Sequence, residues 1–232
     1  MDRPRLIEIF EGLRVSDVCD AMDMVGLMDR GLMNRKIRTL FRDSNAFSHR
    51  ICGPALTARY VPTNHEVPNM DPEAFAAYIE NWRKEISPGF YNEVQLGDVI
   101  VMDAAEMDVG FIGSGNSLGW RSKGAVGVVT NGGARDTDEL IKQGWPVYCR
   151  YISRSFKPGR LEFDSVNTPI NCGGVLVRPG DMIVADGDGV ICVPIEKAAE
   201  VARLARRELV KDKVERRRSY TQLGIPLDDT VK

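Results

Sequence analysis

The chain has 232 residues, enough to bury a full hydrophobic core as one large domain or two small ones. Its hydrophobic content of 43% and charged content of 28% are those of an ordinary globular protein. The formal net charge of −2 gives no indication of a nucleic-acid or membrane-surface partner. A basic run at 216–218 lies within a mixed-charge stretch, which favours a solvated helix face.

The cysteines indicate a reducing compartment, because they are scattered and none belongs to a C-x-x-C pair. Cys52 and Cys192 lie in apolar runs, where a thiol is expected to behave as a small buried hydrophobe. Two histidines offer little for a zinc site. The N-terminal residues lack a signal-sequence pattern, and no apolar run is long enough to span a bilayer. We therefore expect a cytoplasmic protein.

The first part of the chain predicts two short helices, of which the second is capped by Ser16 and ends at Gly26. A strand is expected over 51–62 and a helix over 71–86. Asp71 would cap this helix and Pro72 would occupy its first turn. Its predicted apolar stripe consists of Phe75, Ile79 and Trp82.

The middle of the chain alternates between strand and helix patterns. Strands are expected over 99–105, 125–132 and 146–152, with helices over 117–124 and 135–144 between them. This spacing predicts a parallel α/β unit, in which binding sites lie at the carboxyl ends of the strands.

The remainder of the chain has a different pattern. Residues 166–194 are β-rich, with turns at PGD and DGDG, and predict antiparallel β structure packed on the same core. Residues 195–222 predict a long, charged C-terminal helix. Because no repeat, linker or low-complexity tract is apparent, we expect a single domain over 1–232.

The stretch GSGNSLGWRSKGAVGVVTNGGARD carries the candidate site. Gly113, Ser114, Gly115 and Asn116 lie between a strand and a helix, where successive N–H groups can bind carboxylate or phosphate oxygens. Arg135 follows the next strand and could grip the same anion with its planar guanidinium.

Asp136 is a candidate ligand for a hard divalent cation, with water completing the coordination. An anion site, a guanidinium and a metal carboxylate together suit a 2-oxo acid. The alternative is structural: the glycines form a turn, and Arg135 and Asp136 cap a helix. Neither a dinucleotide fingerprint nor a P-loop fits, because Leu118 replaces the last glycine and G-K-[ST] is missing.

The same stretch resembles the signature of the RraA-like family, also called the 4-hydroxy-4-methyl-2-oxoglutarate aldolase or dimethylmenaquinone-methyltransferase-like family. The likeness extends through VSDVCDAM, CGPALTARYVPTN, GDVIVMDA and VNTPINCGGVLVRPGDMIVADGDGVICVP to the terminal helix. Residues 63–93 are longer than the family's usual connection and fall outside it.

The resemblance implies a swivelling β/β/α-type fold, assembled as a homotrimer or a dimer of trimers with sites at subunit boundaries. It implies that the stretch from Gly113 to Asn116 binds substrate and that Arg135 binds a pyruvate moiety. It further implies that Asp136 holds Mg²⁺ or Mn²⁺. Family members also contribute a glutamate from a neighbouring subunit, for which Glu208 and Glu215 are candidates beside the simpler role of solvated helix residues.

Three functions follow as expectations. The first is a metal-dependent carbon–carbon lyase that cleaves a 2-oxo acid by retro-aldol reaction or decarboxylation and yields pyruvate. The second is a protein-binding regulator of ribonuclease activity, like the family's namesakes. The third is a lyase or isomerase on another sugar acid or keto acid, because Ser114 stands where lyase members often carry an acidic residue and cannot replace a carboxylate in proton transfer.

Two other acidic groups are open to interpretation. The run from Asp186 to Gly189 is too short for an EF-hand, which favours a β-turn. Asp103 and Asp108 follow a strand and could line the pocket or serve only in turns.

Overall fold

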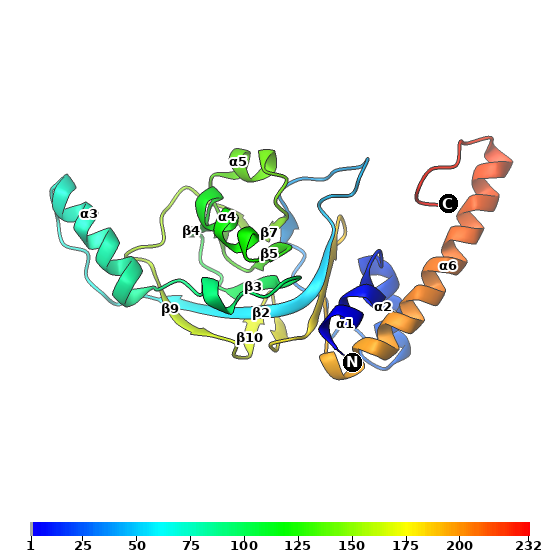
Figure 1. The fold of residues 1–232 in the computed structure, drawn as a ribbon, viewed down its shortest axis with the longest axis horizontal. Helices are drawn as coiled ribbons and strands as arrows, with labels where there is room; N and C mark the ends of the chain where they lie inside the picture. The colour runs from blue at the N-terminus through cyan, green and yellow to red at the C-terminus, as the bar shows by residue number, and fades with distance from the viewer. Residues whose placement is uncertain (1) are drawn as a thin grey trace.

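An eight-stranded sheet forms the centre of the computed structural model, which describes residues 2–232 (Figure 1). Its four middle strands are parallel, and the outer strands pair with them in antiparallel fashion. In spatial order the strands are β1 (Arg38–Thr39), β7 (Val147–Cys149), β5 (Gly127–Thr130), β3 (Val99–Asp103), β2 (Ile51–Pro62), β12 (Met182–Asp186) and β13 (Gly189–Val193), with β9 (Leu161–Val166) paired to the second half of β2.

The long strand β2 joins the two kinds of β structure. Its first residues pair with β12 and its last with β9, while its middle pairs in parallel with β3. The hairpin β12–β13 closes through Asp186 and Gly189, which confirms the β-turn predicted there. The observed fold is thus a mixed α/β domain with a parallel unit and antiparallel strands, as the sequence predicts.

Two smaller sheets lie off the main one. A parallel sheet consists of β4 (Gly110–Ile112), β6 (Gly133–Ala134) and β8 (Tyr151–Ile152). An antiparallel pair consists of β10 (Ile170–Cys172) and β11 (Val175–Val177). The strand expected over 146–152 is therefore two strands in different sheets, because the chain leaves the main sheet at Arg150.

The helices lie in two groups. Helices α4 (Ser114–Ser122) and α5 (Thr137–Lys142) lie over the parallel strands, whereas α1 (Arg3–Phe10), α2 (Val15–Met24) and α6 (Ala198–Leu223) gather at the other end (Figure 1). The first half of α6 buries an apolar stripe against the N-terminal helices and β12–β13, and its second half projects away from them. No helix within residues 2–232 has the length and apolarity that crossing a membrane requires.

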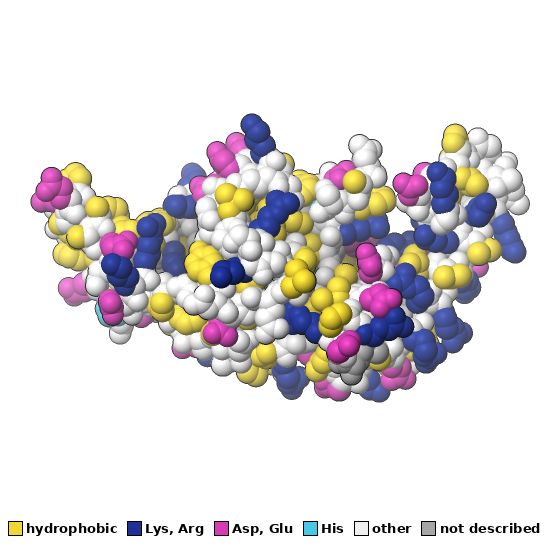
Figure 2. Space-filling view, viewed as in Figure 1, with side chains coloured by type: hydrophobic (Ala, Val, Ile, Leu, Met, Phe, Trp, Pro, Cys, Tyr) yellow, Lys and Arg dark blue, Asp and Glu magenta, His cyan; other side chains and the backbone are white. Residues whose placement is uncertain are grey.

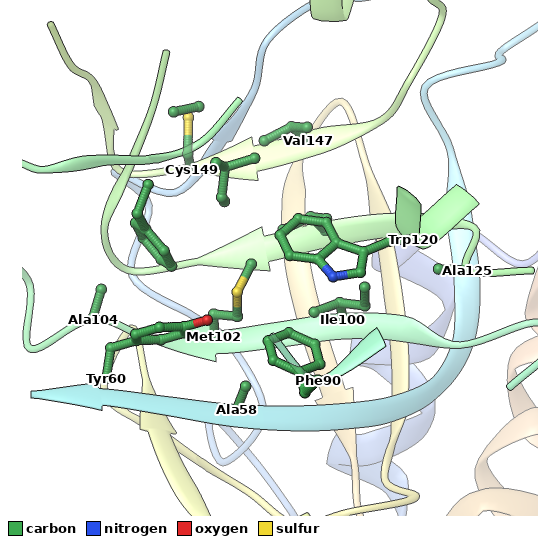
Figure 3. Close-up of a cluster of buried hydrophobic side chains, with 14 of the residues drawn as sticks. Ala58, Tyr60, Phe90, Ile100, Met102, Ala104, Trp120, Ala125, Val147 and Cys149 are labelled. Atoms are coloured by element: carbon green, nitrogen blue, oxygen red, sulfur yellow. The ribbon is translucent and has the colours of Figure 1, made fainter. Parts of the chain in front are cut away.

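The core between the parallel strands and α4 is aromatic (Figure 3). Tyr60, Phe90 and Trp120 pack with Met102 and Ile100 in one buried cluster. The rings of Phe90 and Trp120 stack with centroids 5.7 Å apart. Because Trp120 belongs to α4, this cluster fixes the helix whose first turn carries the candidate site.

Two helix predictions were wrong in detail. Arg14, not Ser16, precedes the first residue of α2, and its N–H donates to the Asp17 carboxylate at 3.1 Å. The Asp17 side chain also accepts from the Arg14 guanidinium at 2.6 Å, and Asp212 of α6 binds the same group. These ion pairs favour the earlier start over a serine cap.

The helix predicted over 71–86 is α3 (Pro72–Asn81) followed by a π-helical turn, Trp82–Ile86. Asp71 caps α3 as predicted, since its carboxylate accepts from the Ala74 N–H at 2.8 Å. The expected core-facing stripe was wrong, because Phe75 is 45% exposed and α3 buries none of its residues. Only Trp82, beyond the end of α3, is fully buried. Helix α3 extends to one side of the molecule (Figure 1).

Candidate functional site

The short parallel sheet brings the predicted site residues together. Gly110 of β4 pairs with Gly133 of β6, and Ile112 pairs with Ala134. Because both strands run the same way, the residues after them lie at one edge. Gly113 follows β4, and Arg135 and Asp136 follow β6. The strands expected over 99–105 and 125–132 are neighbours in the structure, as the β3–β5 pairing shows, but the adjoining strands β4 and β6 bring the site residues together.

The stretch from Gly113 to Asn116 is the N-cap and first turn of α4, which begins three residues before the predicted helix. The reason is a side-chain bond: Asn116 Oδ1 accepts from the Gly113 N–H at 2.8 Å. The Asn116 amide also donates to the Phe111 carbonyl at 2.9 Å. Asn116 thus closes the turn, and the Gly113 N–H is not free for a ligand.

Two N–H groups of this turn remain available. Those of Gly115 and Asn116 have no hydrogen-bond acceptor among residues 2–232, as expected for the first turn of a helix. Ser114 differs, because its N–H and hydroxyl approach Asp136 Oδ2 at 3.2 and 3.3 Å. The anion site therefore consists of two N–H groups instead of four.

Asp136 stands in a left-handed backbone conformation, with φ 53° and ψ 40°, at the N-cap of α5. This conformation costs on the order of 1 kcal/mol for a residue with a side chain. The carboxylate does not cap α5 and instead faces Ser114. Its side chain is 39% exposed. Gly113 makes this approach possible, because a Cβ at that position would lie 2.7 Å from Asp136 Oδ2.

Arg135 lies beside Asp136 with its guanidinium over the ring of Phe156. The guanidinium carbon is 4.6 Å from the ring centroid, within cation–π range. Its Nε is 3.9 Å from Asp136 Oδ1, too far for a hydrogen bond. Gly110 makes room for the aliphatic stem, since a Cβ there would lie 3.0 Å from Arg135 Cβ. The guanidinium of Arg135 is therefore held by the ring of Phe156, and it accompanies Asp136 as a long ion pair without a hydrogen bond.

These residues line one cavity of about 630 Å³. It contains Gly113, Gly115, Asn116, Arg135 and Asp136, but not Ser114, whose hydroxyl is directed at Asp136. The site residues expected from the sequence are thus in one place, with Ser114 as a support of the carboxylate.

The other acidic candidates lie elsewhere. Asp103 accepts from the Ala105 N–H and the Asn131 amide, which are turn and strand-end bonds, and it does not line the cavity. Asp108 does not line it either. Glu208 and Glu215 lie on α6, at the other end of the molecule, so within one chain they cannot reach Asp136 (Figure 1).

The cavity also contains residues that sequence reasoning missed, namely Arg83, Tyr91, Phe156 and Lys157. Arg83 and Tyr91 come from the segment 63–93, which the sequence led us to expect to be longer than the family's usual connection. Its length was the only available signal. No periodicity in the sequence could place these side chains opposite Arg135, because the segment is long and irregular.

The donor set at Asp136 fits a hard cation that keeps most of its water. No cluster of three or more histidine, cysteine or acidic residues occurs within residues 2–232. One exposed carboxylate whose Oδ1 accepts no hydrogen bond is compatible with Mg²⁺, which is commonly held by one or two carboxylates plus waters and substrate oxygens. A structural zinc site is not compatible with it.

Comparison with known proteins gives the family. A family model described as "RraA-like: Aldolase/RraA" matches residues 15–192. The chain belongs to the RraA-like family. This confirms the resemblance drawn from the glycine-rich stretch, and it covers the site residues from Gly113 to Asp136.

Individual relatives are less complete matches. A protein of Halalkalibacterium halodurans named "Putative 4-hydroxy-4-methyl-2-oxoglutarate aldolase" is 36% identical over 128 residues, 54% of this chain and 60% of that protein. One of the same name from Albidiferax ferrireducens is 27% identical over 178 residues, 75% of this chain and 91% of that protein. The chain thus spans 60% of the first relative's length.

Among solved structures, RraAS2 of Streptomyces coelicolor aligns with a TM-score of 0.75 at 25% identity, covering 94% of this chain and 100% of that one. It is described as an unusual member of the RNase ES inhibitor RraA protein family. The RraA-like fold is thereby confirmed over nearly the whole chain.

Proposed function

We propose that this protein is a divalent-metal-dependent carbon–carbon lyase that acts on a 2-oxo acid and yields pyruvate. One observation carries the proposal: the Arg135 guanidinium, the exposed carboxylate of Asp136 and two free N–H groups converge on one cavity, and the only ion pair of Arg135 among residues 2–232 is a long one with Asp136. The aldolase names of relatives support the reaction class.

The proposed binding mode follows from the donors. The N–H groups of Gly115 and Asn116 bind the carboxylate of the 2-oxo acid, and Arg135 binds it from the end of the neighbouring strand β6. Phe156 keeps the guanidinium in position through the ring contact at 4.6 Å. Ser114 holds Asp136 Oδ2, which leaves Oδ1 directed toward a cation.

The proposed reaction breaks the bond one carbon beyond the keto group. The bonding electron pair passes to the 2-oxo unit and gives the enolate of pyruvate. The other fragment leaves as a carbonyl compound, whose hydroxyl proton is released to water, or as carbon dioxide. The enolate then takes one proton from water and becomes pyruvate. A bound Mg²⁺ or Mn²⁺ supplies Lewis-acid polarisation of the keto oxygen. Arg135 stabilises the negative charge that develops on the 2-oxo unit.

The test is a screen of 2-oxo acids for pyruvate release in the presence of Mg²⁺ or Mn²⁺. Asp136→Asn keeps the shape of the side chain but removes the charge that a hard cation requires, so turnover should fall at least about a hundredfold. Asp138→Asn is the matched control, since Asp138 is an exposed acid on α5 that does not line the cavity. Undiminished turnover of chelator-treated Asp136→Asn would contradict the metal assignment.

Two alternatives remain as proposals. A protein-binding regulator of ribonuclease activity is supported by the likeness to RraAS2, and such a role would survive Asp136→Asn. A lyase or isomerase on another sugar acid or keto acid is supported by Ser114, whose hydroxyl serves Asp136 and cannot move a proton as a carboxylate would. Pyruvate release in the screen favours the lyase over both alternatives, and inhibition of a ribonuclease that survives Asp136→Asn favours the regulator.

We also propose that the protein assembles as a homotrimer or a dimer of trimers. The exposed second half of α6, with Val210, Val214 and Leu223 on its surface, supports this assembly. A neighbouring subunit could then bring Glu208 or Glu215 to the site. A cytoplasmic location is supported by the five free cysteines, which are typical of a reducing compartment.

A further inference from the structure

The segment 63–93 forms one wall of the site cavity. It leaves β2, forms α3 and the π-helical turn, and returns to the body before β3. Arg83, Ser87, Gly89 and Tyr91 of this segment are four of the fourteen residues that line the cavity. Figure 2 shows the hollow between α3 and the part of the molecule that carries α4, with basic side chains on its walls.

Arg83 is held over the cavity by the residue before it. Trp82 is fully buried, and its ring packs with Tyr78 at 5.6 Å and with His65 at 5.9 Å between centroids. The Ser87 N–H donates to the Trp82 carbonyl at 2.7 Å and closes the π-helical turn. The position of Arg83 is therefore determined by packing, although its own side chain is exposed.

Arg83 and Arg135 approach the same aromatic ring. Their guanidinium carbons lie 6.0 and 4.6 Å from the centroid of Phe156. The next residue, Lys157, lies with its Nζ 5.1 Å from the ring centroid of Tyr60. Phe156 thus links the Arg135 end of the cavity to a second group of positive charges.

That second group lacks a negative partner. Neither Arg83 nor Lys157 forms an ion pair within residues 2–232. Burial, and then the neighbouring charge of Arg83, lower the pKa of Lys157 to about 8. Asp136 is the one carboxylate that lines the cavity. Its Oδ2 is bonded to Ser114, and its Oδ1 is assigned to the proposed cation. Two adjacent cations without a counter-ion favour an anionic ligand between them.

We propose that Arg83 and Lys157 form a second anion subsite, which takes the negatively charged group at the far end of the substrate. The inference rests on the proposed function, because the first anion subsite at Arg135 positions the 2-oxo acid. The proposal assigns substrate selection to the segment 63–93. A 2-oxo acid with a second anionic group binds at both subsites, whereas one with an apolar tail places that tail against the two cations and gains no contact there.

The test compares two five-carbon 2-oxo acids that differ only at the far end. 2-Oxoglutarate carries a second carboxylate there, and 2-oxopentanoate carries a methyl group. Their affinities are measured by titration calorimetry with Mg²⁺ present, for the wild type, Arg135→Lys, Arg83→Gln and Lys157→Met. Lys84→Gln is the matched control, because Lys84 neighbours Arg83, is exposed, pairs with Glu80 and does not line the cavity.

The wild type should bind 2-oxoglutarate at least about tenfold more tightly than 2-oxopentanoate, as expected for one added charge-assisted contact. Arg83→Gln and Lys157→Met should each remove most of that preference and leave the 2-oxopentanoate affinity unchanged, and Lys84→Gln should change neither. Equal loss for both ligands would mean that the variants disturb the fold, and melting temperatures would show it independently; that result overturns the subsite.

The two proposals fail in different ways. If both acids bind with a dependence on Arg135 but without a preference that Arg83 controls, the second subsite is wrong and the lyase proposal stands. If neither acid binds to the wild type, the second subsite is wrong, and the lyase proposal is wrong as well if no 2-oxo acid in the screen releases pyruvate.

Discussion

Replacing Gly113 with alanine should change the geometry of the site and leave the stability of the fold nearly unchanged. The backbone at Gly113 is extended, with φ −140° and ψ 174°, which alanine adopts without strain. The new Cβ would lie 2.7 Å from Asp136 Oδ2 and 3.6 Å from its Cγ. Carbon and oxygen atoms need more than 3 Å, so the Asp136 carboxylate must move away.

The expected stability change is small because two effects oppose each other. Alanine restricts the unfolded chain, which stabilises the fold by about 0.4–1 kcal/mol. Displacing Asp136 weakens its two long contacts with Ser114, each worth about 1 kcal/mol at most at a part-exposed site. The net change should stay within about 1 kcal/mol, or about 2–4 °C in the melting temperature of a chain of this size.

The expected functional change is large. A reacting or coordinating group displaced by about 1 Å commonly costs on the order of a hundredfold in rate. We expect Gly113→Ala to lower Mn²⁺ affinity and pyruvate release at least about tenfold. Gly115→Ala is the matched control for metal affinity and melting temperature, because its Cβ would have no atom within 4 Å.

The measurements are Mn²⁺ binding by electron paramagnetic resonance, pyruvate release and thermal melting. Wild-type metal affinity in a folded Gly113→Ala would refute the reasoning, since it would mean that the Asp136 carboxylate is not constrained against Gly113. A fall of more than about 4 °C in the melting temperature would contradict the claim that the effect is local.

Three further predictions concern the same chain. Arg135→Lys should lower kcat/KM about ten- to a hundredfold with little change in melting temperature, because lysine lacks the planar fork; wild-type kinetics would exclude Arg135 from carboxylate binding. The preference for 2-oxoglutarate over 2-oxopentanoate should be full below about pH 8 and decline above it. The reason is that Lys157 loses its charge as the pH rises through its lowered pKa. A preference unchanged at pH 10 would mean that the charge of Lys157 does not contribute to it. Sedimentation should give a trimer or hexamer, and a mass near the single-chain 25.8 kDa at micromolar concentration would contradict that assembly.

Much of the fold could be predicted because the pattern of each element is local. The strand over 51–62 has the predicted ends, and the antiparallel strands after 166 follow from their turns at PGD and DGDG. The short strands β4, β6 and β8 could not be predicted, because two or three residues carry no periodicity. These are the strands that bring Gly113 and Asp136 together.

The site could be predicted as a set of residues but not as a set of contacts. The sequence places Gly113 to Asn116 near Arg135 and Asp136, and the structure brings them to one cavity. It could not show that Asn116 closes the turn or that Ser114 supports Asp136, because both depend on side-chain directions in space. The anion site has two free N–H groups, fewer than the four residues of the glycine-rich stretch suggest.

The segment 63–93 combines a helix that its local pattern predicts with side-chain positions that the pattern cannot predict. Its helix α3 carries part of the apolar stripe of a core helix, yet the structure buries only one member of that stripe, Trp82, which lies one residue past the helix end. Burial of that ring positions Arg83 at the cavity that Arg135 and Asp136 also line. If Trp82 is what holds the second subsite, Trp82→Phe should keep an aromatic contact and preserve the preference for the dianion. Trp82→Ala should lose that preference and leave Arg135-dependent binding of 2-oxopentanoate in place, because β4 and β6 build that end of the cavity independently. Equal weakening of both ligands in Trp82→Ala would mean instead that the segment supports the whole cavity, and that selection cannot be assigned to Arg83 alone.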